Sequence, residues 1–137
     1  MEEPDFDQQL AAACLALGST MAFDAIAGPL TGRLLKALPP RSTVVVYGAL
    51  SGQPASFDPV DLTFGQKHIS AFYLPAWTRG LGPQGLARVA RRVQPLLGAE
   101  LQTTVRATAS LAQAPKQIAE YGRRMGEGKV LLVPRGR

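Results

Sequence analysis

The chain has 137 residues, of which 46% are apolar, and it carries a formal net charge of +5 with one cysteine and one histidine. This length supports one compact core, and the lack of a run of 18 apolar residues argues against a membrane-spanning segment. A single cysteine and a single histidine can form neither a disulfide nor a zinc site with three or four such ligands, so no metal site is predicted.

The charge is distributed unevenly along the chain. Residues 1–32 contain five acidic residues and no basic one, whereas residues 33–137 contain all 15 basic residues and the other five acidic ones. A basic segment of this kind is typical of a solvated surface, of a site for an anionic ligand or of a nucleic-acid interface. Basic and aromatic residues do not alternate and no nucleic-acid-binding motif is present, so nucleic acid is not an expected partner. The acidic N-terminus does not resemble a targeting sequence, which predicts a cytoplasmic protein.

From the N-terminus, the first predicted element is an alanine-rich helix over residues 6–16, which ends at Gly18. A strand is predicted over residues 20–26, and a helix over residues 30–38, where leucines recur at helical spacing. Residues 42–48 (STVVVYG) form a continuous apolar run. Such a run is typical of a strand in a parallel sheet that is covered on both faces.

The second half of the chain continues this alternation. A strand is predicted over residues 68–74, and an amphipathic helix with its arginines facing water over residues 86–97. Two further strands, over residues 101–107 and 128–134, flank a helix that starts with a capping box (SLAQ) at Ser110. Because helices alternate with strands throughout, the predicted fold class is α/β with a mainly parallel sheet.

Small residues and aromatic residues follow the first three predicted strands. The segments are IAGP, YGALSG and YLPAW, in that order. In open α/β sheets, ligands bind at the carboxyl ends of the strands, where small residues let backbone groups approach a flat ligand. These three loops are therefore candidates for one ligand site. The alternative is that the glycines only turn the chain.

The order of these segments resembles the C-terminal portion of a medium-chain dehydrogenase/reductase of the zinc-free quinone oxidoreductase branch. The resemblance covers residues 6–134 and is carried by FDAIAG, VVVYGALSG, DPVDLTF and GKVLLVP. It implies that residues 1–100 are the second half of a Rossmann-type, mainly parallel sheet with flanking helices. Residues 101–137 would be a strand-helix-strand segment that returns toward a GroES-like domain. The implied fourth, fifth and sixth strands of the Rossmann sheet are residues 20–26, 44–47 and 69–72.

The resemblance implies hydride transfer from NADPH to a quinone or an α,β-unsaturated carbonyl. No phosphate-binding G-x-G-x-x-G turn opens the chain, so we expect a truncated member whose activity needs a complete site. No catalytic residue is assigned. The implied cofactor contacts are the loops after the three strands and the lysine of the closing G-K motif. They are Gly28, Tyr47, Gly48, Ala49, Phe72, Tyr73, Leu74 and Lys129.

Some residues in and outside these loops are predicted to have a structural role and not a chemical one. Ala27 and Ala71 replace glycines of the family, and each adds a methyl group that narrows the nicotinamide crevice. Tyr47 and Tyr73 are predicted to be packing residues rather than proton donors. Cys14 is predicted to lie in the core, because it lies between alanines and a leucine on a helix. No positive charge nearby in the sequence would make its thiol reactive.

An alternative function is a non-catalytic dimerisation or interaction module. Without the first half of the sheet, the strand at residues 20–26 presents an apolar edge with unpaired backbone groups. We therefore expect a homo-oligomer formed through exposed sheet edges, among them that of residues 68–74, or a separate chain that carries the N-terminal half.

Overall fold

The computed structural model describes residues 5–134. The chain forms two compact units, Met1–Gly80 and Leu81–Arg137. Both units combine parallel strands with flanking helices, so the predicted α/β class is confirmed. No helix within residues 5–134 is long and apolar enough to cross a membrane. The assignment of residues 1–100 and 101–137 to two domains of the family stays a prediction.

The first unit is built on a parallel sheet of three strands in the order β1–β2–β3. The strands are β1 (Met21–Asp24), β2 (Thr43–Val46) and β3 (His68–Ala71). Each lies inside a range predicted from the sequence but is shorter, because strand pairing stops at Asp24, Val46 and Ala71. The predicted strand ends are therefore loops.

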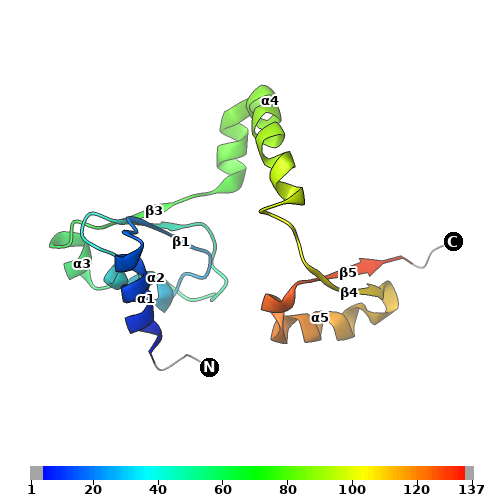
Figure 1. Cartoon of the computed structure of the whole chain (residues 1–137), viewed down its shortest axis with the longest axis horizontal. Coiled ribbons are helices and arrows are strands. Elements are labelled where there is room, and N and C mark those ends of the chain that lie inside the picture. The colour runs from blue at the N-terminus through cyan, green and yellow to red at the C-terminus, as the bar shows by residue number, and fades with distance from the viewer. Residues whose placement is uncertain (1–4, 135–137) are drawn as a thin grey trace. The chain divides into compact units, whose positions relative to one another are not determined.

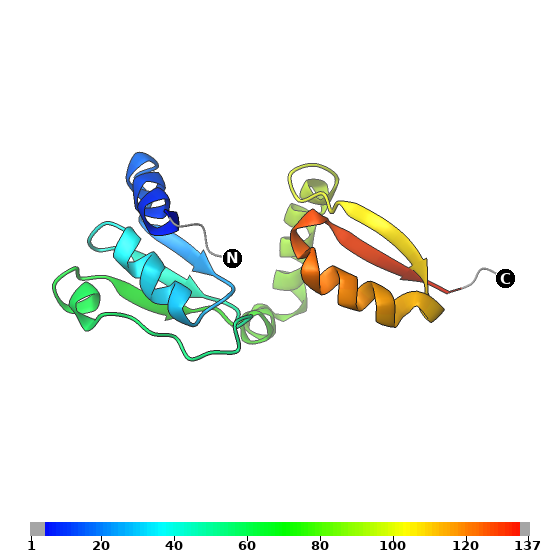
Figure 2. The ribbon, with the colours of Figure 1, turned by 90° about the horizontal axis from the view of Figure 1, so that it is seen from below.

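Two helices, α1 (Phe6–Ala16) and α2 (Pro29–Ala37), cover one face of this sheet (Figures 1 and 2). Proline at the first helical position suits the start of α2, because this position needs no backbone N–H. The core beneath the helices consists of Cys14, Leu35, Leu38 and Val44. The prediction that Cys14 is a core residue is confirmed.

The opposite face of the sheet is open within the described residues. Side chains alternate between the two faces of a strand, so Met21 and Phe23 lie opposite the face that α1 and α2 cover. Met21 is 53% exposed and Phe23 is 68% exposed. In β2, by contrast, Val44 is buried and Val45, on the other face, is half-buried, so the prediction that this strand is covered on both faces stays a prediction.

The long connection after β2 contains a short helix, α3 (Pro59–Thr63), where a loop was predicted. Asp58 is its N-cap, and the side-chain Oδ1 accepts a hydrogen bond from the Val60 N–H at 2.9 Å. An aspartate followed by proline at the first helical position is a recognised helix start. The D-P signal was present in the sequence, but its five-residue helix is too short to show an apolar period.

A buried lysine joins this connection to α2. Lys67 is 8% exposed, and its Nζ donates hydrogen bonds to the Leu35 carbonyl oxygen at 2.6 Å and to Asp61 Oδ1 at 2.8 Å. The positive charge therefore lies against a carbonyl in the last turn of α2, where the helix dipole favours a cation.

The next helix, α4 (Leu74–Val93), starts well before the predicted range of residues 86–97. It contains a break at Gly82, which has a φ of 63° and precedes Pro83. Proline cannot donate the backbone hydrogen bond that a continuous helix needs, so the break is explained by the sequence. Most of the apolar side chains predicted for one face are exposed, as Leu86 (46%) illustrates, whereas Val89 is half-buried.

The second unit pairs β4 (Val105–Ser110) with β5 (Lys129–Val133) in parallel, and α5 (Ala114–Arg123) lies along one face of this pair (Figure 1). The predicted capping interaction is confirmed, because the Ser110 N–H donates to Gln113 Oε1 at 3.0 Å. The strand predicted at residues 101–107 is shifted toward the C-terminus. Three 3-10 helices complete the description: η1 (Gln94–Gly98), η2 (Leu111–Gln113) and η3 (Met125–Glu127).

Candidate cofactor site

The carboxyl ends of β1, β2 and β3 meet at one edge of the parallel sheet. The loops after β1 and β2 are joined there by backbone hydrogen bonds. The Leu50 N–H donates to the Ala25 carbonyl at 3.2 Å, and the Ser51 N–H donates to the Ile26 carbonyl at 2.9 Å. Seven of the eight predicted cofactor residues belong to the segments that follow these strand ends: Gly28, Tyr47, Gly48, Ala49, Phe72, Tyr73 and Leu74.

The loops after β1 and β2 approach each other closely at Gly48. A Cβ atom at this position would lie 2.6 Å from the carbonyl oxygen of Ala25, whereas ordinary van der Waals contact begins at 3.4 Å. The chain itself therefore requires glycine here, with or without a ligand. That a nicotinamide ring also needs this position to be small stays a prediction.

The turn after β1 contains two successive residues with positive φ, Ala27 at 60° and Gly28 at 63°. This conformation is unfavourable for alanine because of its Cβ atom. The Ala27 methyl group is also buried, with the residue 6% exposed. The replacement of the family glycine by Ala27 therefore introduces backbone strain in a turn, rather than only a methyl group in a strand. At Gly28, a Cβ would lie 2.8 Å from Ser51 Oγ.

A buried carboxylate holds this turn. Asp24 is 1% exposed; its Oδ1 accepts hydrogen bonds from the N–H groups of Ile26 (2.9 Å) and Ala27 (2.8 Å), and its Oδ2 accepts one from Thr31 Oγ1 (2.7 Å). Burial on its own raises the pKa of the Asp24 carboxyl. The hydrogen bonds from Ala27, Thr31 and Ile26 together outweigh burial, so the pKa is below its ordinary value. Asp24 is thus ionised at neutral pH.

Aromatic side chains stand exposed at the same edge. Tyr47 is 53% exposed, Phe72 39% and Tyr73 66%. The prediction that the two tyrosines serve in packing is wrong within the described residues. The structure also adds Trp77, which belongs to the segment YLPAW but is not among the predicted cofactor contacts. The centre of its ring lies 5.8 Å from that of Phe72, at an interplanar angle of 59°. Exposed aromatic faces can stack on a planar ligand.

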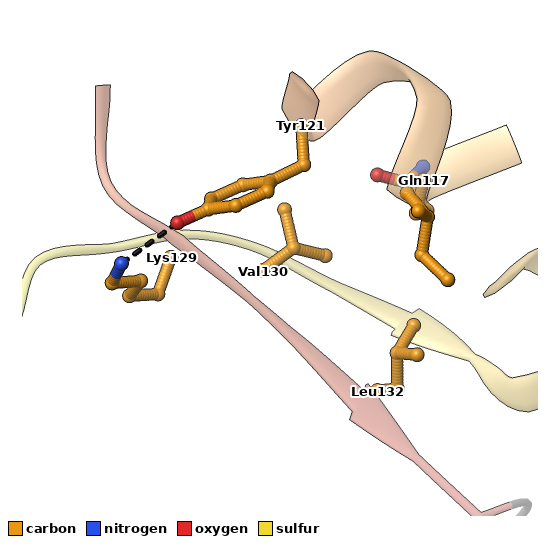
Figure 3. Close-up of a pocket in the computed structure, with 6 residues that line it drawn as sticks. Gln117, Tyr121, Lys129, Val130 and Leu132 are labelled. Atoms are coloured by element: carbon orange, nitrogen blue, oxygen red, sulfur yellow. Dashed lines mark hydrogen bonds between the residues drawn. The ribbon is translucent and has the colours of Figure 1, made fainter. Parts of the chain in front are cut away.

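Lys129 lies in the second unit, at the start of β5 (Figure 3). Its Nζ donates a hydrogen bond to the Tyr121 hydroxyl oxygen at 2.7 Å, and lies 5.4 Å from the centre of that ring. A role for Lys129 at a cofactor stays a prediction. These two residues border a pocket of about 130 Å³ that is lined by Gln117, Ile118, Tyr121, Lys129, Val130 and Leu132.

No group of three or more histidine, cysteine, aspartate or glutamate side chains within residues 5–134 is arranged to hold a metal ion. The candidate site of the first unit is thus formed by backbone, by aromatic faces and by one buried carboxylate behind the loops. Parallel strands with flanking helices and a loop-lined carboxyl edge are characteristic of the Rossmann-type nucleotide-binding folds.

The solved structures that resemble this chain include NADPH:quinone reductases and an alcohol dehydrogenase of the medium-chain dehydrogenase/reductase family, and the resemblance found in the sequence is thereby confirmed. A protein assigned as an NADPH:quinone reductase from Mesorhizobium loti is 29% identical, with a TM-score of 0.72, over 97% of this chain and 38% of that protein.

Two further structures have lower identity and support the fold alone. One, from Bacillus thuringiensis and also assigned as an NADPH:quinone reductase, is 24% identical with a TM-score of 0.69, over 92% of this chain and 39% of that one. The other is a mycobacterial protein in complex with NADPH. It is 23% identical with a TM-score of 0.68, over 98% of this chain and 42% of that protein. No protein-family model and no curated protein matches the chain. The chain spans about two fifths of the length of these solved structures.

Proposed function

We propose that this chain forms the nicotinamide side of an NADPH site in a zinc-free, cytoplasmic, quinone-reductase-like oxidoreductase. When bound, the cofactor supplies a hydride, and the proposed acceptor is a quinone or an α,β-unsaturated carbonyl. The observation that carries the proposal is the edge at which the loops after three parallel strands converge, with backbone of Gly48 and Ala49 beside exposed aromatic faces. The similarity to NADPH:quinone reductases supports the same cofactor.

The edge has the properties that a nicotinamide ring needs. Its backbone amides can hydrogen-bond a carboxamide, and Tyr47 and Tyr73 offer flat apolar surface at the ends of neighbouring strands. A G-x-G-x-x-G pattern occurs at residues 80–85, but it lies inside α4 and does not follow a strand, so no pyrophosphate-binding turn is assigned to it. We therefore expect weak binding by this chain alone, and activity only when the rest of the site is supplied.

The test is a titration of the chain with NADPH and, separately, NADH, followed by nicotinamide fluorescence and by quenching of Trp77, which is the one tryptophan in the sequence. Saturable binding is expected to be abolished by Ala49→Tyr, because Ala49 is exposed at the proposed site. Ala55→Tyr is the matched control, since Ala55 is exposed on the same long connection but away from the strand ends. No saturation with either cofactor at millimolar concentration, or binding unaffected by Ala49→Tyr, would refute the proposal.

The open sheet favours a second function, that of an interaction module. No strand lies beside the outer edge of β1 among the described residues, and Met21 and Phe23 of this strand are exposed. The strand also lacks the lysine, proline or bulge that usually protects an edge. The proposed partners are a second copy, paired through a sheet edge, or a separate chain that supplies the N-terminal half of the sheet.

Sedimentation velocity distinguishes the two partners. A homo-oligomer predicts a concentration-dependent dimer that Phe23→Lys dissociates, because a charge on the open face opposes pairing. A wild-type chain that stays monomeric up to millimolar concentration would exclude the second copy. Recovery of NADPH binding on mixing with an added N-terminal half would support the separate chain.

A further inference from the structure

The carboxylate of Asp24 lies beneath the proposed nicotinamide site and contacts three backbone or side-chain donors from two elements. Its two oxygens accept hydrogen bonds from Ile26, Ala27 and Thr31 at 2.7–2.9 Å, and no other aspartate or glutamate within residues 5–134 is buried. These contacts tie the end of β1 to the first turn of α2. The carboxylate thus fixes the turn that joins them.

The turn that Asp24 fixes has an unfavourable backbone conformation. Ala27 has a φ of 60°, which an L-residue rarely adopts, and it precedes a second positive φ at Gly28. Side-chain oxygens of aspartate stabilise such turns by accepting from backbone N–H groups further along the chain. The Ala27 N–H is one of the two groups that Asp24 Oδ1 accepts from.

The turn after β1 also supports the loop after β2. The carbonyl oxygens of Ala25 and Ile26 accept hydrogen bonds from the Leu50 and Ser51 N–H groups, and the Ala25 carbonyl packs against Gly48. The Gly28 carbonyl accepts from Ser56 N–H at 3.3 Å. The loop after β2 therefore rests on a backbone surface whose shape depends on the turn.

We infer that Asp24 is a positioning residue that sets the backbone of both loops bordering the proposed nicotinamide site, residues 25–28 directly and residues 48–52 through them. Asp24 itself is buried behind the turn and does not contact the ligand. The ligand part of this inference rests on the proposed function, whereas the effect on the loops does not.

The experiment compares backbone amide chemical shifts of the full chain in the wild type and in Asp24→Ala, Asp24→Asn and Thr31→Val. Asp24→Ala is expected to shift the Leu50 and Ser51 amides, although neither contacts Asp24. Asp24→Asn keeps one oxygen for the two N–H groups, so it is expected to give smaller shifts of the same resonances. Thr31→Val removes only the hydrogen bond to Asp24 Oδ2 and is expected to give the smallest shifts of the Leu50 and Ser51 amides. If Asp24→Ala fails to fold, Thr31→Val and Asp24→Asn still test the inference.

Two controls separate positioning from a general loss of stability. Asp58→Asn changes a carboxylate that also accepts from a backbone N–H, but at α3. Leu38→Ala removes a buried core side chain that is 3% exposed, at the far end of α2. Neither control is expected to move the Leu50 and Ser51 amides, even though Leu38→Ala destabilises the fold.

Where the wild type binds NADPH, Asp24→Ala is expected to weaken binding by about 10- to 100-fold, and Leu38→Ala to leave it unchanged. Shifts confined to residues 24–31 in both Asp24 variants, with Leu50 and Ser51 as in the wild type, would overturn the inference. If Leu50 and Ser51 move but the wild type binds no cofactor, positioning by Asp24 stands and the proposed function fails.

Discussion

Replacement of Gly48 by alanine tests why the residue at this position, after β2, must have no side chain. The added Cβ would lie 2.6 Å from the Ala25 carbonyl oxygen, about 0.8 Å inside ordinary contact distance. Because this neighbour is backbone, the two loops must separate, and the hydrogen bond from Leu50 to the same carbonyl must lengthen. Overpacking typically destabilises by about 1–3 kcal/mol and a weakened hydrogen bond by about 1 kcal/mol. We expect Gly48→Ala to lower the free energy of unfolding by about 2–4 kcal/mol.

Urea unfolding followed by Trp77 fluorescence measures this loss, since Trp77 lies in the first unit. Two glycines at which an added Cβ would meet no other atom within 4 Å serve as controls. Gly52→Ala has a positive φ and is expected to lose about 1 kcal/mol from strain alone. Gly80→Ala, inside α4, is expected to gain about 0.5–1 kcal/mol. If Gly48→Ala unfolds within about 0.5 kcal/mol of the wild type yet loses NADPH binding, the residue is small for the ligand, and the packing argument is refuted.

Three further predictions concern the core, the buried lysine and acid stability. Leu35→Ala, at a fully buried residue, is expected to lose about 2–5 kcal/mol, and Leu50→Ala, at a 79% exposed one, less than about 0.5 kcal/mol; equal losses in urea unfolding would contradict the assigned core. Lys67→Met leaves the Leu35 carbonyl and Asp61 without their common donor and is expected to lose about 2–4 kcal/mol, whereas a neutral result would show that the pair contributes no net stability. The lowered pKa of Asp24 stabilises the folded state above the ordinary value of 3.8, and this contribution disappears as the pH falls below 3.8 through the folded pKa. Unfolding measured from about pH 5 to about pH 2 should therefore lose less stability in Asp24→Asn than in the wild type, and parallel curves would count against the assignment.

Local sequence signals were sufficient where a short segment decides its own structure. The helix over Phe6–Ala16 follows from alanine and leucine propensity, and the capping interaction between Ser110 and Gln113 follows from residues three apart. Apolar runs predict the three strands of the first sheet, but the strands end earlier than predicted, at Asp24, Val46 and Ala71. Phe72 and Tyr73 have the composition of a strand, and only pairing, which stops at Ala71, placed them in a loop.

The candidate site shows the same division. The sequence indicated which loops follow the parallel strands, because the α/β alternation and the topology of parallel sheets bring those loops to one edge. It did not indicate Asp24 as the residue beneath them, since an aspartate at a strand end has no local signature of burial. Its role depends on Thr31, seven residues further on, and on a turn conformation that alanine at position 27 does not predict.

The α/β class, the order of the elements and the loops at the carboxyl edge can be predicted from the amino-acid sequence, because they depend on propensity, periodicity and chain direction. Only the tertiary structure shows that Gly48 lacks a side chain because the Ala25 carbonyl lies against it. It also shows that the buried Lys67 pairs with Asp61 and that one face of the β1–β2–β3 sheet is open within the first unit. Each of these results depends on the distance between atoms that are far apart in the chain, and such distances are fixed only when the elements pack together.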